Sequence, residues 1–104
     1  MLSVISQEKS SVHEHRNASN QLTFAFDEIS MGQYSKITRQ VIKEFDLAAC
    51  GDKIKGLDEV FQDFGSGSTL IALEWDNWSG FMICAKSKES ETLARQVAAY
   101  VQNL

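Results

Sequence analysis

Proline is absent from the 104 residues of this sequence. Proline-rich segments adopt the polyproline II conformation, and cis peptide bonds occur almost only before proline. The absence therefore excludes proline-rich linkers, PxxP ligands and cis-proline turns. Turns must instead form at the six glycines and at clusters of asparagine and serine. Proline also guards edge strands against unwanted pairing, so the strand edges here need protection by charge or by a partner.

Cysteine and long apolar runs are also scarce. The two cysteines, Cys50 and Cys84, are too far apart for a CxxC motif and too few for a disulfide framework. The N-terminal segment lacks the basic start and the apolar stretch of roughly seven residues or more that a signal peptide needs. No window approaches the roughly 20 apolar residues that span a bilayer. We therefore expect a cytoplasmic protein.

Positive charge is in the minority. The chain has 10 lysines and arginines against 14 aspartates and glutamates, a formal net charge of −4. This balance disfavours binding to nucleic acid or to a membrane, which needs clustered positive charge. Hydrophobic residues at 43% and charged residues at 23% are typical of a globular chain. A chain of this length usually has one core, so we expect a single domain over residues 1–104.

Alternating apolar residues predict the strands. Leu22, Phe24 and Phe26 share one face of a predicted strand. Residues 69–86 contain two further runs on either side of the turn sequence DNWSG, which predicts a β-hairpin. Residues 1–20 are mostly polar, and we expect them to be partly disordered or to add an edge strand.

A spacing of three to four residues between apolar side chains predicts a first helix over residues 30–50. Ser30 and Gln33 have the form of a capping box at its start. Gly51 follows as a left-handed stop.

The same spacing predicts a second helix over residues 88–103, with Glu91 and Arg95 placed for an ion pair four residues apart. The stretch 57–64 fits both periods. A strand over 59–64 is the prediction, and a short helix is the alternative.

These elements follow in the order (β)-β-α-β-β-β-α. Short hairpin connections require antiparallel pairing, and each helix has one apolar stripe to bury. The sequence therefore predicts an α+β fold, a two-layer sandwich with two helices on one face of an antiparallel sheet of four to five strands.

The cysteines and histidines do not form a recognisable catalytic or metal-binding pattern. Cys50 is placed at the end of the first helix, where the helix dipole disfavours a thiolate, and Cys84 is expected to pack as a small apolar residue. His13 and His15 share one side of a strand, but a metal site needs further ligands. We therefore predict no catalytic residue, no metal site and no cofactor.

Lys36, Arg39 and Lys43 form a short basic stripe on the first predicted helix. Such a stripe is usually a solvated helix face. The alternative is a contact with an anion or with an acidic partner.

The turn of the hairpin at residues 69–86 holds the strongest candidates for binding. Trp75 shares a strand face with apolar residues and is expected in the core. Trp78 lies within the turn, so it either folds back onto the sheet or contacts a partner. Asp76 and Asn77 complete this predicted binding site.

Two motifs resemble those of small uncharacterised bacterial proteins that are classed as domains of unknown function. They are WDNWSGF at residues 75–81 and GLDEV at residues 56–60. The resemblance covers about residues 20–104. It implies a bacterial cytosolic origin and no assigned activity, so it carries over no site residues.

The sequence favours a non-enzymatic interaction or regulatory module. Such a module would use the hairpin tip at residues 74–81 and an exposed sheet face or edge to bind a protein partner or to form a homodimer. The alternative is a small-molecule-binding protein or minor enzyme with a pocket near Trp78 and Asp76. Nucleic-acid binding through the basic stripe ranks third, and no membrane partner is expected.

Overall fold

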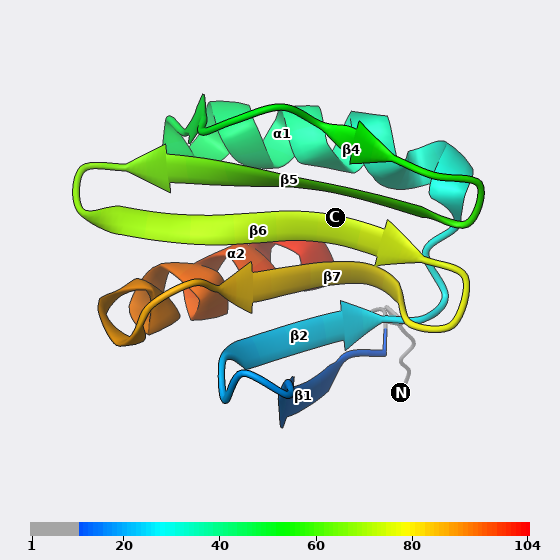
Figure 1. Cartoon of the computed structure of the whole chain (residues 1–104), viewed down its shortest axis with the longest axis horizontal. Helices are drawn as coiled ribbons and strands as arrows, with labels where there is room; N and C mark the ends of the chain where they lie inside the picture. The colour runs from blue at the N-terminus through cyan, green and yellow to red at the C-terminus, as the bar shows by residue number, and fades with distance from the viewer. Residues whose placement is uncertain (1–10) are drawn as a thin grey trace, which may run out of the picture.

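The computed structural model describes residues 11–104. Seven strands form one sheet in the order β1-β2-β7-β6-β5-β3, with β4 also paired to β5 (Figure 1). The strands are β1 His13–Arg16, β2 Leu22–Phe26, β3 Ala48–Ala49, β4 Ile54–Lys55, β5 Glu59–Ser66, β6 Thr69–Asp76 and β7 Gly80–Ala85. The helices are α1 Tyr34–Phe45 and α2 Glu91–Gln102, preceded by the 3-10 turns Met31–Gln33 and Lys88–Ser90.

The predicted α+β class is confirmed. All strand pairs are antiparallel, and both helices lie on the same side of the sheet (Figure 1). The predicted edge strand is present as β1, while residues 1–10 lie outside the described part of the chain. The strand count was too low, because β3 lies within the stretch predicted as the end of the first helix and β4 lies in a stretch to which no element was assigned.

The first predicted helix was too long at both ends. At its start, the predicted capping box is present, with Gln33 Oε1 accepting the N–H of Ser30 at 3.0 Å, but the turn it closes is a 3-10 turn. At its end, α1 stops at Phe45 because Asp46 takes a left-handed φ of 53°. Gly51 does not stop a helix. With φ 105° it bends the chain between β3 and β4, which lie along β5.

The ambiguous stretch is a strand. β5 pairs with β6 along all eight of its residues, so the alternative of a short helix is wrong. Val60 and Phe64 point into the core, with 3% and 2% of their surface exposed. The more exposed Phe61 and Asp63 lie on the opposite face, as expected for a strand with one buried face.

The core lies between the two helices and one face of the sheet. Alternation along β2, β6 and β7 brings their large apolar side chains to this face. The fully buried large apolar side chains of the core are, from the strands, Leu22, Phe26, Ile71, Leu73, Phe81 and Ile83, and, from the helices, Val41 and Val97. Tyr34 joins them, and its hydroxyl donates to the backbone oxygen of Leu73 at 2.6 Å. Burial raises the pKa of Tyr34 to about 12.

Two ion pairs tie β1 to α2. Arg16 donates to the Glu91 carboxylate at 2.6 Å, and Arg95 donates to Glu14 at 3.3 Å. The predicted ion pair between Glu91 and Arg95 is therefore replaced by two others. Glu91 pairs with Arg16 and Arg95 pairs with Glu14, both on β1. Sequence spacing on a helix cannot reveal competing partners on a strand far along the chain.

Acid is expected to loosen β1. The hydrogen bond from Arg16 holds the pKa of Glu91 below its usual 4.5. A carboxyl whose pKa falls on folding stabilises the folded state above its unfolded pKa, and this contribution is lost as the pH drops through the folded value. The hydrogen-exchange protection factors of β1, measured against those of β7, should therefore be lower at about pH 3 than at about pH 6.

A Glu91→Gln protein is the control for this pH effect. It should show weak β1 protection at both pH values, because it has no carboxylate to titrate. Unchanged β1 protection in this variant at about pH 6 would contradict the assigned role of the ion pair.

The other face of the sheet is not covered by either helix of the described chain (Figure 1). Its centre is filled by Thr23, Ala25, Ala72, Met82 and Cys84, all buried. We call this side the open face. Neither α1 nor α2 has the length and apolar content that crossing a membrane requires, among the residues described.

Candidate interaction surface

The two tryptophans of the predicted site have different surroundings. Trp75 lies at the margin of the core, partly buried, and its indole N–H donates to the backbone oxygen of Ile29 at 2.8 Å. Trp78 is 80% exposed. The alternative in which Trp78 folds back onto the sheet is therefore wrong, and its indole is presented to solvent.

Asp76 fixes the turn that carries Trp78. Its Oδ1 accepts the backbone N–H of Trp78 at 2.9 Å and that of Ser79 at 2.6 Å, as expected for an aspartate that starts a turn. The N–H of Asn77 donates to the backbone oxygen of Asp58 at 3.1 Å. This last bond joins the β6–β7 turn to the β4–β5 turn, so both turns form one end of the molecule (Figure 1).

Leu57 is a second exposed apolar side chain at this end, and sequence reasoning did not select it. It lies between β4 and β5 and is 95% exposed. Its spacing from Val60 suggested a shared apolar face, but the turn separates the two. The available signal was local: Gly56 and Asp58 flank Leu57, as is typical of a turn. We call Leu57 and Trp78 the tip cluster.

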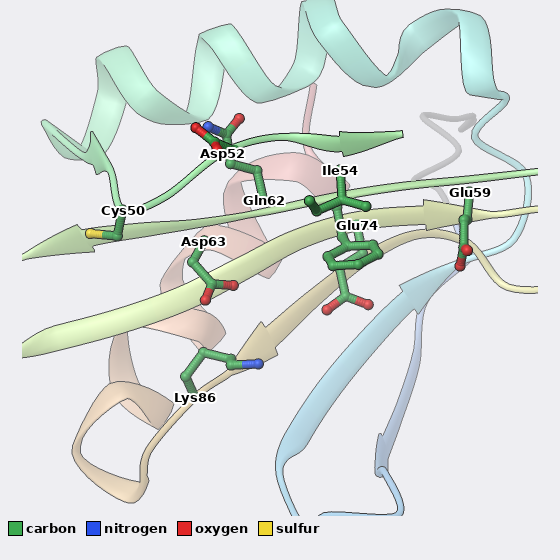
Figure 2. A pocket seen from close by; sticks show the side chains of 9 residues that line it. Cys50, Asp52, Ile54, Glu59, Gln62, Asp63, Glu74 and Lys86 are labelled. Carbon is green, nitrogen blue, oxygen red and sulfur yellow. The ribbon is translucent and has the colours of Figure 1, made fainter. Parts of the chain in front are cut away.

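A shallow hollow of about 420 Å³ lies on the open face over β4, β5 and β6 (Figure 2). It is lined by Cys50, Asp52, Ile54, Glu59, Phe61, Gln62, Asp63, Glu74 and Lys86. Ile54 and Phe61 are cross-strand partners and remain 50% and 38% exposed. The hollow therefore has an apolar middle.

The charged residues of this hollow are mostly acidic. Its carboxylates are Asp52, Glu59, Asp63 and Glu74. Lys86 is the single cation among the nine lining residues. Strand pairing also places Glu59 directly opposite Asp76, and like charges in that position repel each other. The register of β5 against β6 thus concentrates negative charge on the open face.

Glu74 is the most perturbed of these carboxyls. Burial raises its pKa above the usual 4.5, Lys86 lowers it, and the neighbouring Asp63 raises it again. In Figure 2 the side chain of Lys86 reaches toward the side of the hollow where Asp63 and Glu74 lie. Because the ionised form of this half-buried carboxyl is disfavoured, an ionised Glu74 destabilises the folded state.

We expect Glu74→Gln to stabilise the fold at neutral pH. An acid whose pKa rises on folding costs nothing below its unfolded pKa, and its cost grows as the pH rises to the folded value and beyond. The variant should gain about 0.5–1 kcal/mol in urea unfolding at about pH 7, with solvent screening allowed for. The gain should vanish at about pH 3.5. An equal gain at both pH values would show that packing, not ionisation, is responsible.

The geometry gives little support for a nucleophilic cysteine or for a metal site. Cys50 is exposed and follows β3, not a helix end as predicted, while burial raises the pKa of the Cys84 thiol. His13 Nε2 lies 3.6 Å from the carboxylate of Asp27. Within residues 11–104, no three His, Cys, Asp or Glu side chains are arranged to hold a metal ion.

The predicted basic stripe lies on the outer side of α1. Lys36, Arg39 and Lys43 are all exposed, and with Gln40 and Ile42 they line a second shallow hollow. The buried residues of α1 point to the sheet, so this stripe and the open face are on opposite sides of the molecule (Figure 1). The stripe is basic, whereas the hollow on the open face is lined by four carboxylates and one lysine.

Comparison of the chain with protein-family models, curated proteins and solved structures gives no significant match. The resemblance to bacterial domains of unknown function therefore stays a prediction.

Proposed function

We propose that this protein is a non-enzymatic interaction module that binds another protein through the tip cluster. One observation carries the proposal: Leu57 and Trp78 are 95% and 80% exposed on two turns that are hydrogen-bonded to each other. Large apolar side chains are unfavourable in water, and they mark contact sites when they gather at one place. Tryptophan is also one of the residues that dominate binding energy at interfaces.

The backbone around the tip cluster supports this function because it is well held. The Asp76 carboxylate caps the β6–β7 turn, and the bond from Asn77 to Asp58 ties that turn to its neighbour. A surface that is already in its bound conformation loses less entropy on binding. Asp76 and Asn77 are therefore assigned to positioning Trp78.

The alternative of a ligand pocket around Trp78 and Asp76 is less well supported. Trp78 projects into solvent, and one Asp76 oxygen is engaged by backbone N–H groups. Neither residue lines the hollow in Figure 2.

The experiment is affinity capture from a lysate of the native host, with three tagged proteins. These are the wild type, the double variant Leu57→Ser with Trp78→Ser, and the control Leu104→Ser. Leu104 is 55% exposed but lies at the C-terminus, outside the tip cluster. Proteins retained by the wild type and the control but lost from the double variant support the proposal.

Two results would contradict this function. One is retention of the same proteins by the folded double variant. The other is retention of no protein by any bait. Size-exclusion light scattering of the three proteins identifies the case in which the partner is a second copy of the chain, as in a homodimer.

A further inference from the structure

We propose that the hollow on the open face receives lysine or arginine side chains of a basic protein partner. This inference rests on the proposed protein-binding function and adds the chemistry of the partner. The hollow and the tip cluster are adjacent in the chain, because Glu59 lines the hollow and Leu57 is two residues before it. A single partner can therefore cover both.

Charge complementarity is the first argument. Four carboxylates line the hollow against the one ammonium of Lys86. Glu59 also faces Asp76 across the β5–β6 pair, where repulsion remains unless a cation comes between or beside them. A basic partner would relieve this repulsion, and an acidic one would be rejected.

The alternation of β4 strengthens this argument. Lys55 is paired with Val60, whose side chain is in the core, so Lys55 belongs to the helix side of the sheet. Lys53 and Lys55 together line a small cavity there with Tyr34. Ile54, between the two lysines, belongs to the open face. The segment that contains β4 thus keeps Lys53 and Lys55 away from the hollow.

The apolar middle of the hollow specifies the kind of cation. Lysine and arginine have long aliphatic stems that pack on apolar surface while the charged end stays at a polar rim. Ile54 and Phe61 offer that surface. The carboxylates of Asp63 and Glu74 line the same hollow (Figure 2). An arginine or lysine above the Phe61 ring would gain a cation–π contact as well.

The test is an NMR titration of the isotope-labelled full chain. The probe is a short synthetic peptide of lysine, alanine and leucine, and the matched peptide has glutamate in place of each lysine. We expect the basic peptide to shift the amide signals of β4, β5 and β6. Its affinity should fall about tenfold or more between about 50 and 300 mM salt.

Matched charge reversals locate the site. The pair Glu59→Lys and Asp63→Lys should weaken binding of the basic peptide at least about tenfold. The control pair Glu44→Lys and Glu89→Lys changes the net charge equally on the helix side, and it should change the affinity less than about twofold. If the first pair does not fold, Glu59→Gln with Asp63→Asn replaces it.

Several outcomes would overturn the inference. They are equal binding of the two peptides, shifts confined to α1 or β1, equal effects of the two variant pairs, and no binding of the basic peptide. Concentration-dependent shifts of the open face without any peptide would assign it to a second copy instead. Peptide shifts confined to the tip cluster would overturn this inference while leaving the proposed function in place, and that function has its own test with Leu57 and Trp78.

Discussion

Gly80→Ala should cost at least about 3 kcal/mol of stability, which is a large share of what holds a small domain together. Gly80 begins β7 with φ 74°, a left-handed conformation that L side chains rarely adopt. A Cβ built there would collide with the backbone oxygen of Phe26 and lie 2.7 Å from the Cα of Asp27. These are backbone atoms at the end of β2, which pairs with β7, so they cannot move aside as a flexible side chain could.

Gly67→Ala is the matched control for this prediction. Gly67 also has a positive φ, of 62°, but nothing lies within 4 Å of the added Cβ. It should therefore lose only the conformational term, about 1 kcal/mol. Urea unfolding followed by circular dichroism measures both variants. Equal losses of unfolding free energy in Gly80→Ala and Gly67→Ala would contradict the close approach of the β2 backbone to Gly80.

The position of Gly80 also links stability to the candidate site. The residue closes the turn that carries Trp78, and it does so against the end of β2. A partly folded Gly80→Ala protein should therefore also lose the wild-type fluorescence of its tryptophans, since the turn and the margin of the core move together.

Phe81→Ala should lose about 3–5 kcal/mol, the usual cost of removing a buried phenylalanine. Phe81 is 0% exposed, and its ring centroid lies 5.7 Å from that of Tyr34 and 6.5 Å from that of Phe26. These neighbours come from β2 and α1, so the cavity would lie where sheet and helix layers meet.

Phe61→Ala is the comparison, because Phe61 is in the same sheet but on the open face and 38% exposed. It should lose about 1 kcal/mol, for lost contact area without a closed cavity. Thermal and urea unfolding of the Phe81→Ala and Phe61→Ala proteins measure both losses of stability. Equal losses would mean that the open face is covered as well as the helix side is.

Much of the fold could be predicted from the sequence because its signals are local. The alternation of Leu22, Phe24 and Phe26 identified a strand and its buried face, and the hairpin around Trp78 followed from two such runs and a turn. Helical spacing identified α1 and α2. The strand β5 was the preferred of two alternatives, and pairing with β6 decided it.

The candidate site was predicted only in part. Trp78 could be selected from its place in a turn, but its exposure depends on where the turn points. Leu57 was missed, since its spacing matched an apolar stripe that the β4–β5 turn interrupts. Cys50 was misplaced for a similar reason: helical spacing does not show where Asp46 turns the chain.

The sequence by itself determined the fold class and, in the strands and helices that show one clear period, which side chains face the core, because backbone periodicity within one element sets both. Glu59, Phe61 and Asp63 share one face through the alternation of β5 alone, but only the tertiary structure decided that Glu74 lies beside them. That arrangement depends on the register of β5 against β6 and on β4 joining their edge. Register and exposure are properties of paired strands, so no single segment of the chain contains them.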